Sequence, residues 1–179
     1  MASILKFNQA QHTNGTNSYS IGSDGLLRPK VPMFQVKALN VDQAYISSGG
    51  FAKLIWNGVD VDTANYWDST NHRYTPSIAG WYMFGGVVRA NLSGIMTNVG
   101  MSITKNGSDN TNNGTSLKTQ FQYNADVITN GEYPMPTGML YLNGTGDYVE
   151  VYWECDENCT IHDTTSRKSF FWGTLIHAT

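Results

Sequence analysis

The chain has 179 residues and a formal net charge of −3, and only 14% of its residues are charged, below the roughly 25% usual in soluble domains. Asn, Ser, Thr and Gly make up 67 residues, and these types favour turns and strand surfaces over helices. The composition therefore excludes a helical bundle and predicts one all-β domain. The net charge also gives no electrostatic reason to expect nucleic-acid binding, since proteins that bind nucleic acid display a basic patch or stripe.

Residues 1–31 are predicted to form an extended N-terminal anchoring arm. The first apolar run is too short for a secretory signal, so we expect synthesis in a cytoplasm. A polar stretch follows, and Pro29 and Pro32 close the segment because proline does not continue a central strand. A flexible leader is the alternative to a docking arm. The apolar residues expected to dock on a partner are Ile4, Leu5, Phe7, Tyr19, Ile21, Leu26 and Leu27.

Residues 32–179 are predicted to form a β-sandwich, with no segment of helical periodicity and no apolar run long enough to span a membrane. Eight runs have the β-branched, aromatic or alternating pattern of strands. These runs are 34–39, 52–56, 81–90, 99–105, 117–123, 138–142, 148–155 and 170–176. Six Asn-Gly dipeptides predict type I′ hairpin turns. They begin at Asn14, Asn57, Asn106, Asn113, Asn130 and Asn143.

The run 81–90 is apolar on both faces, so both faces need a cover. Tyr82 and Phe84 share one face, and Trp81 and Met83 share the other. We expect the second sheet to cover one face and a neighbouring subunit to cover the other.

The run 148–155 alternates between two kinds of residue. Val149, Val151 and Trp153 are assigned to the core, whereas the acidic residues fall on the opposite face with Tyr148 and Tyr152.

No residue pattern predicts catalysis or a cofactor. There is no Gly-x-Ser-x-Gly elbow, and the four histidines are scattered along the chain, at His12, His72, His162 and His177. Cys155, Cys159 and His162 make only one irregular half of a zinc-ligand pattern, so we expect no metal there. A disulfide between Cys155 and Cys159 and a pair of free thiols both fit the spacing.

Two sets of loop residues raise the question of binding. Carboxylates that suit calcium, but for which we expect turn capping instead, are Asp60, Asp62 and Asp68. Aromatic and polar side chains that suit either a glycan or the rim of a subunit interface are Trp67, His72 and Tyr133. The sequence leaves glycan binding open.

Several short motifs occur in order along residues 32–176: Pro32-Met-Phe34, Tyr66-Trp-Asp68, Tyr74-Thr-Pro76, Gly80-Trp-Tyr-Met-Phe84, Lys105-Asn-Gly107, Gly146-Asp-Tyr-Val149 and Phe170-Phe-Trp-Gly-Thr-Leu-Ile176. Their types and order resemble the globular head of the complement recognition protein and its relatives. The resemblance spans about four-fifths of the chain. It implies the jelly roll shared with tumour necrosis factor, here with about ten antiparallel strands, and a homotrimer. The residues assigned to the core or the trimer interface are Phe34, Trp81, Tyr82, Phe84, Tyr141, Trp153, Phe170, Phe171 and Trp172.

The leader differs from the complement-type proteins, because no collagen repeat or secretory signal precedes the head. It resembles the N-termini of small virion proteins of bacteriophages, especially phages of cyanobacteria. The matching segments are Ser3–Phe7, Asn14–Thr16, Ile21–Gly25 and Pro32–Phe34.

Together the two resemblances imply a non-enzymatic phage virion protein, made in the host cytoplasm. Our leading hypothesis is a trimeric capsid decoration (cement) protein on the capsid surface, anchored by its arm to the major capsid protein or another virion protein. The alternative is a tail-fibre or baseplate tip that binds a host-surface glycan or protein receptor. A bacterial surface lectin is a third hypothesis, disfavoured by the lack of an export signal. We expect no nucleic-acid or membrane partner.

Overall fold

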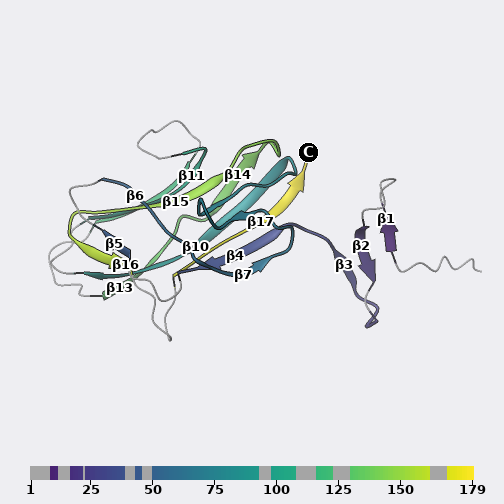
Figure 1. The fold of residues 1–179 in the computed structure, drawn as a ribbon, viewed down its shortest axis with the longest axis horizontal. Coiled ribbons are helices and arrows are strands. Elements are labelled where there is room, and N and C mark those ends of the chain that lie inside the picture. Colours follow the sequence, from purple (N-terminus) through teal and green to yellow (C-terminus); the bar gives the residue numbers. More distant parts are fainter. Residues whose placement is uncertain are drawn as a thin grey trace, which may run out of the picture. The chain divides into compact units, whose positions relative to one another are not determined.

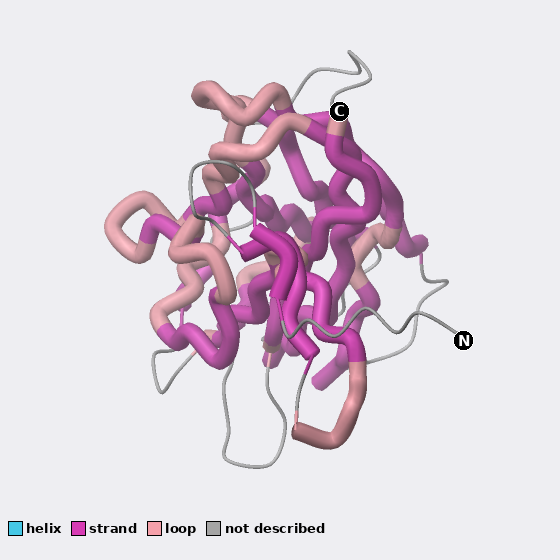
Figure 2. The backbone as a smooth tube through the Cα atoms, turned by 90° about the vertical axis from the view of Figure 1, so that its right-hand side faces the viewer, coloured by secondary structure: helices cyan, strands magenta, loops and turns pink. Residues whose placement is uncertain are grey.

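The computed structural model describes residues 9–11, 17–21, 23–38, 43–45, 50–92, 98–107, 116–122, 130–161 and 169–179. Every helix or strand element in these ranges is a β-strand (Figures 1 and 2). A membrane-spanning helix is absent from the part of the chain that the structure describes. The chain divides into two compact units, Met1–Pro32 and Met33–Thr179, called here the N-terminal unit and the head.

The N-terminal unit contains a small antiparallel sheet that the sequence did not predict. Its strands, in sheet order, are β1 (Gln9–Gln11), β2 (Asn17–Ile21) and β3 (Leu27–Pro29). The turn between β2 and β3 is held by Asp24, whose Oδ1 accepts a hydrogen bond from the Leu26 amide at 3.1 Å. Gly25 in this turn has a φ of 75°, a conformation that favours glycine.

The head is a sandwich of two antiparallel sheets. The eight-stranded sheet comprises β4 (Met33–Lys37), β5 (Gln43–Tyr45), β7 (Gly58–Asp62), β10 (Gly80–Leu92), β13 (Asn130–Pro134), β14 (Gly138–Leu142), β16 (Cys159–Ile161) and β17 (Phe170–Ala178). The six-stranded sheet comprises β6 (Ala52–Lys53), β8 (Trp67–Asp68), β9 (Arg73–Tyr74), β11 (Asn98–Lys105), β12 (Ser116–Gln122) and β15 (Val149–Cys155).

Strand β10 is the centre of the eight-stranded sheet. It pairs with β17 and β16 along one edge and with β14 and β13 along the other (Figure 1). Strand β15 has the corresponding place in the six-stranded sheet, between β11 on one side and β6 and β9 on the other. The long runs 81–90 and 148–155 of the sequence therefore form the two central strands.

The core between the sheets is built around aromatic rings. The Phe34 ring stacks 4.2 Å from that of Tyr74 and meets the Phe171 ring edge-on at 5.0 Å. Gly173 makes room for this packing, because a Cβ there would lie 2.6 Å from a Phe34 ring carbon and 2.5 Å from a Phe84 ring carbon. Aromatic pairs in such arrangements stabilise a core beyond the area that they bury.

The all-β jelly-roll prediction is confirmed, and each of the eight predicted runs overlaps a strand of the head. In β15 the assigned core face is also confirmed, since Val149, Val151 and Trp153 are fully buried. Six strands of the head overlap no predicted run: β5, β7, β8, β9, β13 and β16. Strand β7, for example, has the sequence Gly-Val-Asp-Val-Asp, with short apolar side chains and two acids.

None of the four described Asn-Gly dipeptides forms the predicted two-residue hairpin. Asn106 and Gly107 do have positive φ values, 60° and 123°, but β11 ends at Lys105 and β12 begins only at Ser116. The predicted turn at Asn130 is wrong, because Asn130 and Gly131 lie inside β13 and pair with β10. The dipeptides at Asn57 and Asn143 also lack a positive φ at the asparagine. Pairing with β10 overrides the local turn preference at Asn130.

Candidate functional site

The outward side of the eight-stranded sheet carries a set of apolar side chains, called here the outer sheet face. Side chains alternate between the two sides of a strand, and Tyr82 and Phe84 of β10 are fully buried in the core. Their neighbours on β10 therefore point away from the core. The outer sheet face comprises Met33, Trp81, Met83, Met139, Tyr141 and Trp172.

Strand register brings these side chains into adjacent rows. One row runs from Tyr141 on β14 to Trp81 on β10, and the rings of the two lie 5.7 Å apart in an edge-on arrangement. The next row runs from Met139 on β14 through Met83 on β10 and Thr174 on β17 to Met33 on β4. The face thus continues across four strands that are distant in sequence.

A large part of the outer sheet face is accessible to solvent. The exposed fractions are 44% for Trp81, 54% for Met139, 43% for Met33 and 38% for Tyr141. A contiguous apolar patch in contact with solvent is typical of an interaction surface.

Trp172 forms the third row and is half-buried. It lies opposite Gly85 on β10, where an added Cβ would come within 2.9 Å of the Trp172 indole. The missing side chain at Gly85 lets the indole lie across the neighbouring strand. A larger residue at Gly85 would lift the indole off the sheet.

Charged groups lie at two margins of the outer sheet face. Lys105 donates a hydrogen bond to the Tyr141 carbonyl at 3.0 Å, and its Nζ lies 5.8 Å from the Tyr141 ring. Lys37 on β4 forms an ion pair with Asp60 on β7. These groups give the apolar rows a polar rim, as protein interfaces commonly have.

The structure divides the residues assigned to the core or the interface. Five of them have exposed fractions of 2% or less and pack in the core: Phe34, Tyr82, Phe84, Trp153 and Phe171. Trp81 and Tyr141 lie on the outer sheet face, and Phe170 and Trp172 are half-buried on the same outward side of β17. Sequence reasoning missed Met33 and Met139, although the alternation of Met139 and Tyr141 with two buried leucines on β14 marks the outward side.

The predicted docking residues of the N-terminal unit are described in part. Ile21, Leu26 and Leu27 are exposed by 37%, 62% and 62%. Tyr19 lies in β2. Ile4, Leu5 and Phe7 lie outside the described residues.

The outward side of the six-stranded sheet is polar and mostly covered. Glu150 and Tyr152 are 5% and 7% exposed, and Ser102 and Thr104 on β11 are buried as well. Glu150 forms an ion pair with Lys53 on β6 and accepts a hydrogen bond from the Tyr152 hydroxyl at 2.8 Å. Burial, together with this carboxylate, raises the pKa of Tyr152. The buried charge therefore has partners on the neighbouring strand and on its own strand.

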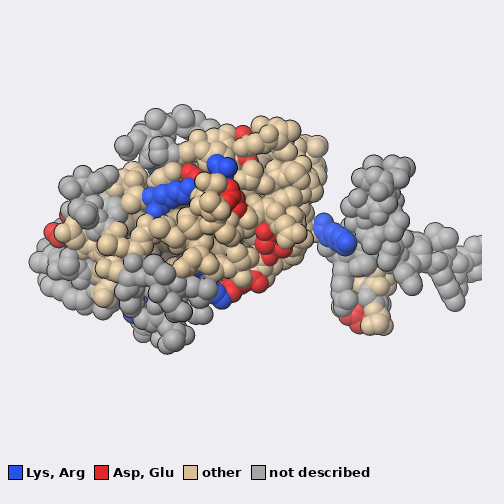
Figure 3. Space-filling model, viewed as in Figure 1, with Lys and Arg blue, Asp and Glu red and all other residues tan. Residues whose placement is uncertain are grey.

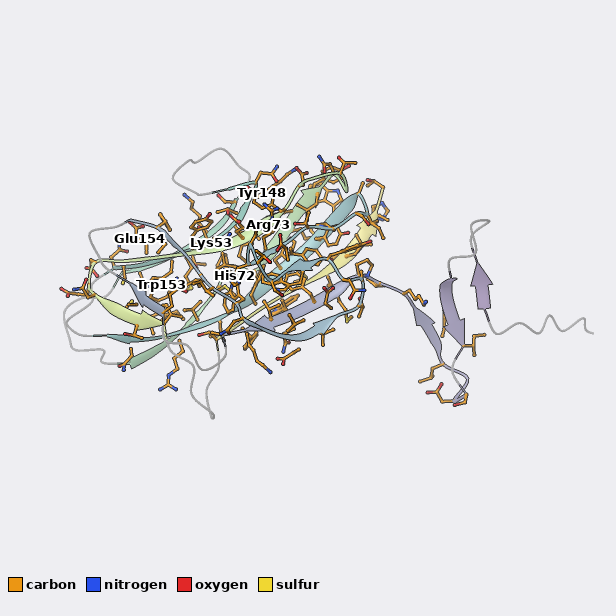
Figure 4. All side chains as sticks on the ribbon, viewed as in Figure 1. Lys53, His72, Arg73, Tyr148, Trp153 and Glu154 are labelled. Atoms are coloured by element: carbon orange, nitrogen blue, oxygen red, sulfur yellow. The ribbon has the colours of Figure 1, made fainter. Side chains whose placement is uncertain are left out.

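Arg73 and Tyr148 lie farther along this side, as Figure 4 shows beside Lys53. The Arg73 guanidinium lies 4.5 Å from the centre of the Tyr148 ring, and its Nε is 3.4 Å from Asp68 Oδ2. In the view of Figure 3 the basic and acidic side chains are interspersed on a largely uncharged surface.

The carboxylates considered for calcium have structural partners. Asp62 accepts hydrogen bonds from the amides of Ala64, Tyr66 and Trp67 and so holds the loop after β7. Asp68 accepts bonds from Asn71, whose side chain lowers the pKa of Asp68. These bonds confirm the turn-capping roles predicted for Asp62 and Asp68. The prediction is wrong for Asp60, which lies within β7 and forms an ion pair with Lys37 on β4.

The aromatic residues considered for glycan binding are engaged within the head. Tyr133 is 2% exposed, and its ring lies 5.4 Å from that of Trp153. Trp67 stacks on Phe34 at 5.5 Å. The half-buried His72 has its Nδ1 3.1 Å from the Trp56 carbonyl oxygen. The three residues do not form a shared aromatic platform, and Trp67 and Tyr133 contribute to the core.

Cys155 and Cys159 are both buried and are free thiols, with their Sγ atoms 3.4 Å apart. His162, the third member of the irregular zinc pattern, lies outside the described residues, as does His12. Among the described residues no group of three or more His, Cys, Asp and Glu side chains is placed to hold a metal ion.

No protein-family model matches the chain, and no curated protein matches its sequence. The globular domain of zebrafish complement 1qA matches with a TM-score of 0.56 and 16% identity, covering 83% of this chain and 99% of that chain. Eiger TNF of S. frugiperda matches with a TM-score of 0.62 and 11% identity, covering 84% and 95%. Murine APRIL matches with a TM-score of 0.56 and 10% identity, covering 82% and 100%. The chain therefore has the jelly-roll fold of the complement 1q and tumour necrosis factor domains.

Proposed function

We propose that the chain is a non-enzymatic bacteriophage virion protein, a homotrimer that decorates the capsid and is anchored by its N-terminal unit. The trimer and the anchoring rest on two different surfaces of the molecule. The assignment to a virion rests on the resemblance of the leader to phage virion proteins.

The outer sheet face is the observation that carries self-association. It places two methionines, Trp81 and Tyr141 in solvent on one continuous surface. Each fully buried side chain of this size contributes about 1.5–3 kcal/mol, so leaving several exposed in the working molecule is unfavourable. Packing against a neighbouring copy around a threefold axis would cover the face in every subunit, because a closed ring repeats one contact.

The N-terminal unit supports the anchoring role. Its strands have three, five and three residues, too few to bury a core of their own. Leu26 and Leu27 are largely exposed at the turn and at the start of β3. A unit that presents apolar side chains in this way gains stability by docking on a partner, for which we propose the capsid shell.

A trimer would also bind the capsid shell more strongly than a single chain. Three N-terminal units on one trimer engage the shell together, so weak individual contacts combine into strong attachment. Decoration proteins at local threefold positions match the symmetry of a trimer.

Sedimentation velocity of the full-length chain at micromolar concentration tests the self-association. We expect a species with the mass of three copies. A monomer at concentrations up to on the order of 100 μM, where even weak specific complexes form, would refute the trimer.

Quantitative mass spectrometry of purified virions tests the location. Copies on the order of hundreds per particle indicate decoration of the shell, whereas a few trimers indicate the tail-tip alternative. Absence from virions refutes both.

Deletion of residues 1–31 tests the anchor separately. A truncated head that still binds capsids with full affinity would contradict the anchoring role.

A further inference from the structure

Cys155 and Cys159 lie where the chain crosses from one sheet of the sandwich to the other. Cys155 is the last residue of β15 in the six-stranded sheet, and Cys159 is the first residue of β16 in the eight-stranded sheet. Only three residues, 156–158, connect them, at the end of the sandwich where β15 leads into β16 (Figure 1). A covalent bond between the two sulfurs would join the sheets at this end.

The two thiols are held close together by the strands that carry them. Cys155 pairs with Val99 on β11, and Cys159 pairs with Leu92 on β10. The loop between them is fixed by a hydrogen bond from the Asp156 amide to the Asn98 carbonyl at 3.2 Å. The Sγ atoms lie 3.4 Å apart. A disulfide has a sulfur–sulfur distance of about 2.0 Å, so the two sulfurs must move about 1.4 Å closer to form one.

The surroundings of the two sulfurs differ. Trp153 Nε1 donates a hydrogen bond to Cys155 Sγ at 3.4 Å, and the Cys155 thiol donates one to the Glu157 carbonyl at 2.8 Å. Either thiol can be the donor in the contact between the two cysteines. This contact lowers the pKa of Cys155 and raises that of Cys159, and the Trp153 indole lowers the pKa of Cys155 as well. The carboxylate of Asp156 opposes this shift at Cys155. Cys155 is thus the sulfur with the greater thiolate character.

We infer that Cys155 and Cys159 form an oxidation site, a dithiol that hydrogen peroxide converts to an intramolecular disulfide. The Cys155 thiolate attacks one peroxide oxygen and breaks the O–O bond; hydroxide leaves and takes a proton to become water. Cys159 loses its proton, attacks the sulfur of the Cys155 sulfenic acid and expels the hydroxyl group as a second water. Two thiols and one peroxide give one disulfide and two waters. The inference is independent of the proposed assembly.

Peroxide titration of the reduced full-length chain tests the site. After treatment, the protein is denatured and alkylated with iodoacetamide, and its intact mass is measured. We expect both cysteines to become inaccessible to alkylation together, with the loss of two hydrogen atoms and no gain of oxygen. Dithiothreitol should restore both thiols.

Two single variants assign the order of the steps. In Cys159→Ser, Cys155 should stop at the sulfenic acid, which dimedone traps. In Cys155→Ser, Cys159 should react at least roughly tenfold more slowly, because thiolate character sets reactivity. Equal reactivity of the two variants would overturn the assigned order.

Circular dichroism checks that the variants fold, and the wild-type result decides the main claim if they do not. Two alkylatable thiols that remain in the folded wild type, at a peroxide dose that oxidises dithiothreitol completely, would overturn the oxidation site. Disulfides found only between chains would also overturn it.

Discussion

The two outer sides of the sandwich differ both in polarity and in burial, although on each sheet the outward residues alternate with core residues along the strands. On the eight-stranded sheet the outward residues are apolar, and Trp81 and Met139 are about half exposed. On the six-stranded sheet the outward residues are polar, yet Glu150, Ser102 and Thr104 are buried. Polarity alone therefore does not tell which side of this protein is covered.

On the covered side, a neighbouring strand of the same sheet supplies the partner of the buried Glu150. Strand β6 runs beside β15, where Lys53 pairs with Tyr152 and the Leu54 amide donates to the Val151 carbonyl at 2.9 Å. This segment brings Lys53 to the buried carboxylate of Glu150. The apolar side has no comparable covering among the described residues, and we propose that a second copy supplies it. The polar side is therefore buried within one chain, whereas we propose that the apolar side is buried by self-association.

The largest expected effect concerns the core on which both sides depend. Phe34→Ala should lower the free energy of unfolding by about 3–5 kcal/mol, because it removes the ring that stacks on Tyr74 and meets Phe171. Urea unfolding followed by tryptophan fluorescence measures this loss. A loss below about 1 kcal/mol would show that the ring is not central to the core.

The next prediction tests the apolar side alone. Trp81→Glu should weaken self-association by roughly 30-fold, about 2 kcal/mol, while the monomer stays folded, because the substituted position is 44% exposed. Sedimentation equilibrium gives the change in affinity. Lys118→Gln, at an exposed position of β12 in the other sheet, makes the same change in charge and should leave association unchanged. Equal effects of the two variants would contradict the proposed interface.

The third prediction concerns Asp147, in the turn that joins the eight-stranded sheet to the six-stranded sheet. Burial raises the pKa of Asp147, but hydrogen bonds from Asn106, Lys105 and the Asn143 amide lower it by more. The pKa of Asp147 therefore lies below the ordinary value. Such a carboxylate stabilises the fold above its unfolded pKa of about 3.9, and this contribution is lost as the pH falls through the folded pKa.

Asp147→Asn should therefore cost about 1.5 kcal/mol at neutral pH, and the difference from wild type should shrink on acidification. Urea unfolding at several pH values measures both quantities. A loss that stays constant down to about pH 2.5 would indicate a packing effect instead of a charge effect.

The smallest effect is expected on the covered polar side. The Thr104 hydroxyl is buried and has no hydrogen-bond partner among the described residues. Thr104→Val keeps the shape of the side chain and removes this group, so stability should stay equal or rise by less than about 1 kcal/mol. Thermal unfolding measures the difference. A clear loss of stability would show that the hydroxyl takes part in the polar network around Glu150.

Much of the fold was predictable because its strands have strong local patterns. The alternation in β15 and the apolar run of β10 identify both central strands, and the ordered motifs identify the jelly roll. Strand β7, with the sequence Gly-Val-Asp-Val-Asp, has a weak pattern and depends on its pairing with β4. Strands β1, β2 and β3 have three to five residues and depend on one another.

The candidate site was predictable in part. Trp81 and Met83 were placed opposite the core by counting along one strand, and β10 bears this out. Met33 joins them through the pairing of β4 with β17, which depends on long-range register and is not encoded locally. The burial of Glu150 was missed for a related reason, since its cover comes from a segment about 100 residues earlier in the chain.

The pairing of β4 with β17 has a consequence for how the protein is made. These strands come from opposite ends of the head, and Val36 lies directly opposite Phe171. The eight-stranded sheet therefore lacks one of its inner strands until β17 has left the ribosome. Because pairing between such distant segments is slow, we expect the head to complete its fold only after β17 has emerged, and its other aromatic strands need protection until then.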